Sequence, residues 1–231
     1  MIEKLQWFND NINYMFRQNI VEYDMQTASL AVSDRFGLIP KDRLIQLRNM
    51  PKDQRTRQVG LMQREDREFS NRLIQGIIDT RQEFLDKNHI SEADIICVHS
   101  DAIIFNMKAA ITDTVDCVRF VPKNAWSSYL RYNGIEIYYG NGVIDYKGIP
   151  KEMLKVHTLG INKYLLKIFN MMELCDESVL DYIRKTQTKY LQDKLPDHFY
   201  IPFGRMGAHK TENLGLFAFI ANAVIGDMYE W

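Results

Sequence analysis

The sequence has few cysteines and no long apolar run. Its cysteines, Cys97, Cys117 and Cys175, are far apart and form no C-x-x-C pattern, so we expect reduced core residues in a cytoplasmic protein, with no disulfide framework and no zinc site. No stretch approaches the ~20 apolar residues that cross a bilayer, so we expect no membrane partner. The acid-containing start, with Glu3, is also unlike a signal peptide.

Net charge is nearly absent as well. The chain has 29 Lys and Arg against 30 Asp and Glu, so any nucleic-acid site must come from local clusters of basic residues. Its histidines show no spacing typical of metal ligands. What the 231 residues do provide is a hydrophobic content of 46%, which is enough for one large domain or for a core with two appendages.

Two apolar runs, residues 95–98 and 102–105, flank the polar residues His99, Ser100 and Asp101. This pattern predicts two short β-strands joined by a tight bend. A carboxylate at such a bend sits on rigid backbone and points outward, as a metal ligand must, so Asp101 is the first functional candidate. A turn aspartate that bonds its own backbone would look the same, and that alternative stays open. A Ser-His-Asp relay is excluded, because neighbours on a strand point to opposite faces.

A second carboxylate, Asp24, lies near the end of a predicted strand over residues 19–25. Residues 26–36 then change to helical spacing, and Gly37 marks the expected end of that helix. Metal and phosphate ligands often collect where a strand ends beside a helix start, although a structural N-cap aspartate has the same pattern. Two carboxylates from distant strands that meet on one sheet suit divalent ions bridging a triphosphate and an attacking oxygen.

Residues 41–88 are strongly charged and compatible with helix, with interruptions at Pro51 and Gly60. Basic side chains after Pro51 are the candidates for binding a triphosphate or a strand backbone, namely Arg55, Arg57 and Arg64, with Lys52 a turn from Arg55. A solvated charged helix is the alternative, because acidic residues are interleaved. Residues 69–85 follow with the spacing of an amphipathic helix.

Successive β-like runs follow the central bend, over residues 116–122, 128–132, 135–139 and 143–147. Asn-Gly pairs separate the last three runs, which predicts a meander of antiparallel strands. Lys123 and Lys147 are the basic residues expected to face a groove on this meander, unless they are ordinary strand-end lysines.

The rest of the chain returns to helix. Residues 151–194 carry two apolar stripes at helical spacing, and residues 214–225 predict a buried helix. Between them, residues 204–210 form a basic loop that would suit nucleic-acid phosphate, with a plain surface loop as the alternative.

The two aspartates lie in segments that resemble motifs of family B DNA polymerases. Residues 22–30, Glu-Tyr-Asp-Met-Gln-Thr-Ala-Ser-Leu, are similar to the first palm motif, in which an aspartate ends a strand and a helix follows. Residues 99–105, His-Ser-Asp-Ala-Ile-Ile-Phe, are similar to the Asp-Thr-Asp-Ser turn of that family, with Asp101 on its second aspartate.

Two later segments extend the resemblance over about residues 19–150. Residues 121–129 are similar to the Lys-x-x-Tyr element, and residues 145–149 to the Lys-Gly segment, that follow the turn in these polymerases. The resemblance therefore implies nucleic-acid contacts from Lys123, Tyr129 and Lys147.

The resemblance implies an α+β fold with a polymerase palm-like antiparallel sheet. The palm-like core would take residues 1–40 and 89–150, a fingers-like helical insertion residues 41–88, and a thumb-like helical part residues 151–231. The implied activity is nucleotidyl transfer onto a nucleic-acid 3′ end, with primer-template DNA and nucleoside triphosphates as partners. Asp24 and Asp101 would hold two Mg²⁺ or Mn²⁺ ions as the catalytic metal ligands, and Arg55, Arg57 and Arg64 would take the phosphates.

The sequence also departs from the family pattern. His99 replaces the first acid of the turn, the fingers motif Lys-x-x-x-Asn-Ser-x-Tyr-Gly is absent, and no proofreading domain precedes the palm. We therefore expect a minimal, phage-encoded polymerase of the host cytoplasm, with a protein partner that supplies the missing parts as a further option. The alternatives are a catalytically inactive palm fold that binds nucleic acid or protein, and a two-metal nuclease that uses the same carboxylates.

Overall fold

The computed structural model describes residues 2–107, 111–204 and 212–229. Contacts divide the chain into two compact units, residues 1–10 with 21–125, and residues 11–20 with 126–231. The fold class is α+β, as predicted. The units differ from the predicted division, because strands after residue 125 pair with a strand from residues 11–20 and so leave the first unit.

The larger sheet has the strand order β1-β4-β5-β3-β7-β6. Strand β3, which carries Asp24, therefore pairs with β5, the strand after the predicted bend. It does not pair with β4, the strand before the bend. The strands of this sheet are β1 (Gln6–Phe8), β3 (Ile20–Met25), β4 (Ile95–His99), β5 (Ala102–Asn106), β6 (Thr114–Val115) and β7 (Val118–Trp126).

The predicted bend is a β-hairpin. Strands β4 and β5 pair antiparallel, with His99 opposite Ala102, so Ser100 and Asp101 form a two-residue turn. Ser100 has φ of 57°, in the left-handed region that short hairpin turns require. Asp101 therefore follows a residue in a constrained conformation.

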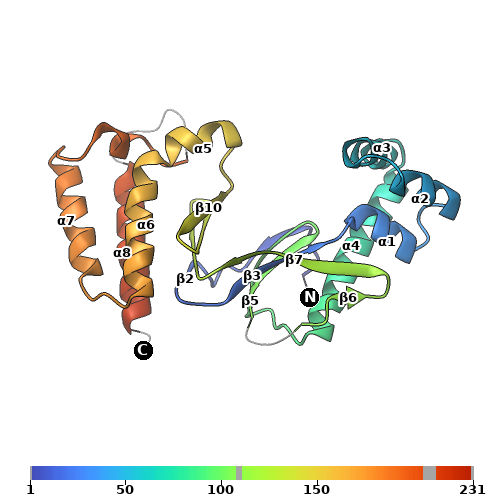
Figure 1. Cartoon of the computed structure of the whole chain (residues 1–231), viewed down its shortest axis with the longest axis horizontal. Coiled ribbons are helices and arrows are strands. Elements are labelled where there is room, and N and C mark those ends of the chain that lie inside the picture. Colours follow the sequence, from blue (N-terminus) through green and yellow to red (C-terminus); the bar gives the residue numbers. More distant parts are fainter. Residues whose placement is uncertain (1, 108–110, 205–211, 230–231) are drawn as a thin grey trace. The chain divides into compact units, whose positions relative to one another are not determined.

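Four helices belong to the first unit: α1 (Ala28–Arg35), α2 (Lys41–Arg48), α3 (Lys52–Glu65) and α4 (Arg67–Lys87). Pro40 and Pro51 stand directly before α2 and α3, and Asp66 caps α4 by accepting a hydrogen bond from the Phe69 N–H at 2.9 Å. In Figure 1, α2 and α3 lie near the end of α4 where α4 begins. Residues 41–88 are thus mostly helical, as predicted.

Aromatic side chains join α4 to the sheet. Phe84 of α4 stacks on Phe120 of β7 with ring centroids 3.9 Å apart, and Tyr23 of β3 stacks on Phe105 of β5 at 5.8 Å. Because side chains alternate along a strand, the inward position of Tyr23 places Glu22 and Asp24 on the other face of β3. The aromatic core thus decides which face of the sheet carries the acids.

The second unit contains the predicted meander. Its sheet has the order β10-β9-β8-β2, from β8 (Ser128–Tyr132), β9 (Ile135–Gly140), β10 (Val143–Lys147) and β2 (Tyr14–Met15). In both Asn-Gly turns φ is positive at each residue, 51° and 78° in the first and 52° and 78° in the second, as a type I′ hairpin requires.

Helices complete the second unit: α5 (Lys151–His157), α6 (Leu159–Glu173), α7 (Val179–Leu191) and α8 (Glu212–Tyr229), with a short 3₁₀ helix at Asp197–Tyr200. Helices α6, α7 and α8 lie alongside one another in Figure 1 and share one apolar core, in which Tyr164, Phe169 and Phe217 are fully buried. Most of the predicted basic loop, residues 205–210, lies outside the described residues.

The cysteines only partly follow the prediction. Cys97 is buried in β4, but Cys117 and Cys175 are exposed. The reason is local: Cys117 lies in the tight turn between β6 and β7, and Cys175 lies two residues after the end of α6 with φ of 51°. None of the helices in the described part of the chain is long and apolar enough to span a bilayer.

Two helix glycines should respond in opposite directions to alanine. A Cβ on Gly76 of α4 would lie 2.7 Å from Val32 Cγ1 and 2.9 Å from Phe36 Cδ2, so Gly76→Ala should lower the free energy of unfolding by about 1–3 kcal/mol. Gly60 of α3 has open space, so Gly60→Ala should raise it by about 0.5–1 kcal/mol. Urea unfolding of both variants measures the difference, and a stabilising Gly76→Ala would contradict the close packing of α1 against α4.

Candidate active site

Asp24 and Asp101 are brought together by the larger sheet. Asp24 is the penultimate residue of β3, Asp101 precedes β5, and these two strands are neighbours. The Met25 N–H donates to the Asp101 carbonyl at 3.1 Å, which joins the residue after Asp24 directly to Asp101. Two acids 77 positions apart in the sequence are therefore adjacent in the fold.

Proximity and burial change the electrostatics of Asp101. Burial raises the pKa of the Asp101 carboxyl, and the negative charge of Asp24 raises it further, with a smaller effect from Glu22. Lys123 acts in the opposite direction. A partly desolvated carboxylate beside a second acid is an arrangement that a bound cation relieves.

Lys123 extends from β7, on the other side of β3. Its Nζ lies 3.4 Å from Asp24 Oδ2 and 3.8 Å from Glu22 Oε1. Burial lowers the pKa of Lys123, but the charges of Asp24 and Glu22 outweigh that effect and raise it overall. Lys123 is thus the cationic member of the acid cluster.

Glu22 is a third acid at this place, and it was not among the sequence candidates. Its side chain is 3% exposed, and Asn124 Nδ2 donates to its Oε2 at 2.6 Å. The signal was present in the sequence, because residues two apart on a strand share a face, and Glu22 and Asp24 are so spaced. We name Glu22, Asp24, Asp101 and Lys123 the carboxylate cluster.

A pocket of about 610 Å³ opens beside the cluster. Asp24 and Asp101 line it, together with the start of α1 and one face of α3. From α3 come Lys52, Arg55, Thr56, Val59, Gly60 and Gln63. The lining therefore combines two carboxylates from the sheet with two basic residues from α3.

Of the three arginines predicted to bind phosphate, only Arg55 lines this pocket. Arg57 and Arg64 are not among its lining residues, which corrects their predicted grouping. At 100° per residue, one side of α3 carries all its lining positions, 52, 55, 56, 59, 60 and 63. Positions 57 and 64 lie about a quarter turn or more from the middle of that side. Lys52 takes their place.

The start of α1 adds partial positive charge to the pocket. Thr27 precedes α1 with φ of 52°, and no side chain caps the first turn of this helix. The N–H groups of a first turn have no partner within the helix, and the helix dipole is positive there. Thr27, Ala28 and Ser29 line the pocket, so an anion in it would meet these groups.

A buried arginine holds the turn that carries Asp101. Arg81 of α4 is fully buried and donates to the carbonyls of Ser100 at 3.0 Å, Ile2 at 3.0 Å and Lys4 at 2.6 Å. The Ser100 N–H also donates to the Leu5 carbonyl at 2.6 Å. Burial lowers the pKa of Arg81 to about 10, so it stays charged at neutral pH. Arg81 and the N-terminal segment together position the turn.

The family model of the bacteriophage PBS1 gene 130 protein matches residues 1–216. The chain belongs to this family. The phage association expected from the sequence is therefore confirmed. A comparison with curated proteins finds no match. The family description names a gene product and no activity.

His99 occupies the position where the resembled turn has its first acid. In this gene 130 family member its ring packs edge-on against Phe8, with centroids 5.4 Å apart, and its Nε2 lies 3.4 Å from Cys97 Sγ. Its contacts are those of a strand-end packing residue. Glu22, whose charge acts on Asp101, is the third acid near the turn instead.

Two of the residues predicted to contact nucleic acid lie in the second unit of the gene 130 family chain. Tyr129 is fully buried and packs against Tyr138, so its side chain does not present a nucleic-acid contact in this structure. Lys147 lies over the rings of Trp126 and Tyr138, at 5.5 and 5.4 Å from their centroids. These placements do not support the predicted contact for Tyr129 and give Lys147 a packing role.

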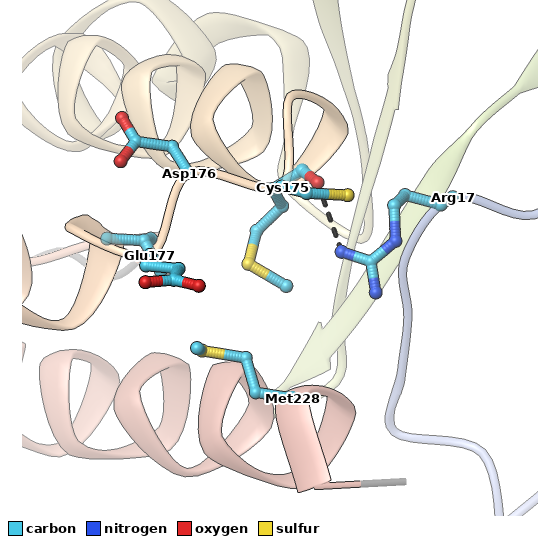
Figure 2. Close-up of a pocket in the computed structure, with 7 residues that line it drawn as sticks. Arg17, Cys175, Asp176, Glu177 and Met228 are labelled. Carbon is cyan, nitrogen blue, oxygen red and sulfur yellow. Dashed lines mark hydrogen bonds between the residues drawn. The ribbon is translucent and has the colours of Figure 1, made fainter. Parts of the chain in front are cut away.

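The second unit also has an apolar pocket of about 370 Å³, shown in Figure 2. Arg17 at its edge donates to the Met172 carbonyl at 3.0 Å and forms an ion pair with Asp227 of α8. A guanidinium at the C-terminal end of α6 complements the dipole of that helix. Arg17 thus fastens α6 to α8, which is a structural role.

Asp101→Asn should stabilise the metal-free gene 130 family protein. The raised pKa means that the folded state binds the Asp101 proton more tightly than the unfolded chain does. The free energy of unfolding therefore falls as the pH rises from the ordinary pKa of an unfolded aspartate through the raised pKa of folded Asp101. Asparagine removes this penalty, so the thermal midpoint should rise by a few degrees at pH 7, at about 2–4 °C per kcal/mol, and not at pH 3. Asp79→Asn, at an exposed site on α4, should leave the midpoint unchanged. A lower midpoint for Asp101→Asn at pH 7 would contradict this electrostatic account.

Arg81→Met should destabilise the first unit by about 3 kcal/mol or more, because it leaves several buried carbonyls without their charged donor. Arg72→Met changes an exposed arginine of the same helix and should have little effect. Denaturant unfolding measures both variants. Equal stability of the two would show that Arg81 does not hold the turn.

Proposed function

We propose that this phage-family protein is a palm-type nucleotidyltransferase. It would extend a nucleic-acid 3′ end by metal-assisted phosphoryl transfer, with Asp24 and Asp101 as the catalytic carboxylates. The observation that carries the proposal is the adjacency of these two acids on neighbouring strands β3 and β5, beside a pocket with a basic wall. The resemblance to family B DNA polymerase motifs supports the same assignment.

The residues fit a pair of hard divalent cations. All the candidate ligands are carboxylate oxygens, which Mg²⁺ and Mn²⁺ prefer. The charge of Asp24 adds to burial in raising the pKa of Asp101, so the bare pair is electrostatically unfavourable and a cation is favoured there. When bound, such ions supply positive charge that stabilises the triphosphate and the attacking oxygen. Asp24 and Asp101 would hold them.

The chain's own residues would place the triphosphate. Lys52 and Arg55 of α3 line the pocket together with Asp24 and Asp101, and so does the start of α1, whose first turn has no side-chain cap. Phosphoryl transfer asks mainly for positioning and charge stabilisation from the protein, which such walls provide. A nucleoside triphosphate with its phosphates between α1 and α3 would have its reacting phosphorus near Asp24 and Asp101.

The partners that follow are primer-template DNA and nucleoside triphosphates, and the place of action is the cytoplasm of an infected host. Of the three predicted nucleic-acid contacts, Lys123 belongs to the carboxylate cluster, and its side chain is 52% exposed. The fingers motif is absent from the sequence, so a protein partner would have the role of holding the template.

Asp24→Asn and Asp101→Asn should each lower nucleotide incorporation by at least 100-fold while the protein stays folded, because each removes a metal-ligand charge. The assay is extension of a labelled primer on a DNA template with Mg²⁺ or Mn²⁺, and circular dichroism checks the fold. Asp79→Asn serves as the matched control and should keep full activity.

Each competing function has a distinct outcome in this assay. Shortening of the labelled strand by the wild type, lost in the same two variants, would replace the polymerase by a two-metal nuclease. Template binding that is equal in the wild type and both variants, without synthesis or cleavage, would point to a non-catalytic palm fold. Incorporation retained in either variant would refute the assigned roles.

A further inference from the structure

Lys123 lies where a cation is needed. Its ammonium contacts the carboxylates of Asp24 and Glu22, and its charge also acts on Asp101. The cluster therefore combines three carboxyl groups with one ammonium group. Without Lys123, three acids would face one another with no counter-charge from the cluster.

A divalent ion on Asp24 would have to share this place with the ammonium. The Lys123 Nζ stands 3.4 Å from Asp24 Oδ2, within ion-pair distance of the oxygen that a metal would take. Two cations on one carboxylate oxygen repel each other strongly at such a separation. Metal binding and the Lys123 ion pair are thus in competition.

We propose that Lys123 is a built-in counter-ion of the site: it neutralises Asp24 while no metal is bound and withdraws when a divalent cation arrives. This inference rests on the proposed function, since it assumes that Asp24 is a metal ligand. It assigns to Lys123 a regulatory role in metal loading, in addition to the nucleic-acid contact predicted from the sequence.

The surroundings of Lys123 allow this movement. Its side chain is 52% exposed and belongs to an exposed stretch of β7, residues 122–125, so the long flexible stem can swing into solvent or toward a phosphate. Glu22 is not left alone when Lys123 moves, because Asn124 still donates to it at 2.6 Å. The departure therefore does not strand a buried carboxylate without a hydrogen bond.

The withdrawn ammonium would be free for the nucleic-acid backbone. A lysine released beside bound metal and triphosphate can pair with a strand phosphate, which is the contact that the sequence predicted. One residue would then serve two states in turn: the ion pair with Asp24 in the metal-free protein, and a phosphate contact in the loaded complex. Only molecules in which the ion pair is open can bind the metal. The apparent metal affinity is therefore the intrinsic affinity multiplied by the open fraction.

The test is direct Mn²⁺ binding to the full chain without nucleotide or nucleic acid. The free metal is followed by electron paramagnetic resonance at about 0.15 M salt, where the Debye length is about 8 Å and distant charges are screened. Lys123→Met keeps the stem and removes the charge, and its Kd should fall about tenfold. Lys123→Arg keeps the charge and should bind Mn²⁺ no more tightly than the wild type.

Arg119→Met is the matched control. Arg119 lies on the same strand and its removal changes net charge equally, but it pairs with exposed Asp113 at 3.2 Å. Its Kd should stay within twofold of the wild type. Thermal unfolding of each variant confirms that the protein remains folded, and Asp24→Asn identifies binding at the cluster by abolishing it.

The outcomes separate the inference from the proposed function. If the wild type binds Mn²⁺ through Asp24 but Lys123→Met gives the same Kd, the counter-ion role is overturned and the metal site stands. Equal tightening by Arg119→Met would overturn it as well, as a general charge effect. If neither the wild type nor Lys123→Met binds Mn²⁺ through Asp24, both the inference and the proposed metal chemistry fall.

Discussion

The central constraint in this protein is that two acids are forced together by strand pairing. Strand β3 lies beside β5, and the Met25 N–H donates a hydrogen bond to the Asp101 carbonyl. This pairing fixes the positions of Asp24 and Asp101 relative to each other. Like charges at close range are unfavourable, and partial burial of Asp101 makes them more so. The cation Lys123 and the hydrogen bond from Asn124 to Glu22 are the compensations that the first unit builds around this conflict.

The strands and the turn that carry these acids are held in place by packing on the opposite face of the sheet and by hydrogen bonds to the turn. The stacked pairs Tyr23–Phe105 and Phe84–Phe120 fix β3, β5 and β7 against α4. Arg81 of the same helix reaches the Ser100 carbonyl, so one helix both packs on the sheet and holds the residue before Asp101. A strained or repulsive site persists only where its surroundings over-determine it, and here core packing and a buried guanidinium do so.

This arrangement is unfavourable for the stability of the folded first unit, because burial and the charge of Asp24 both act against the ionised Asp101 carboxyl. Stability alone would favour an uncharged residue at position 101 and no left-handed serine before it. The pocket beside the cluster has the complementary character, with basic side chains of α3 and the uncapped start of α1. In the second unit, by contrast, the Arg17 guanidinium donates to the Met172 carbonyl and pairs with Asp227, and so fastens α6 to α8.

Local patterns in the sequence were sufficient for most elements of the fold. Pro51 before α3, the Asn-Gly turns of the meander and the apolar runs around Ser100 each act through a few neighbouring residues, so helices, hairpins and the candidates Asp24 and Asp101 were predicted from sequence alone. The residues that only the tertiary structure revealed depend on long-range pairing. The roles of Glu22 and Arg81, the packing of Tyr129 and Lys147 and the position of Lys123 against Asp24 follow from which strands and helices meet, and so does the division at residue 125. Short-range periodicity carries no information about such contacts, because they join residues up to about a hundred positions apart through a core that forms only when the whole unit folds.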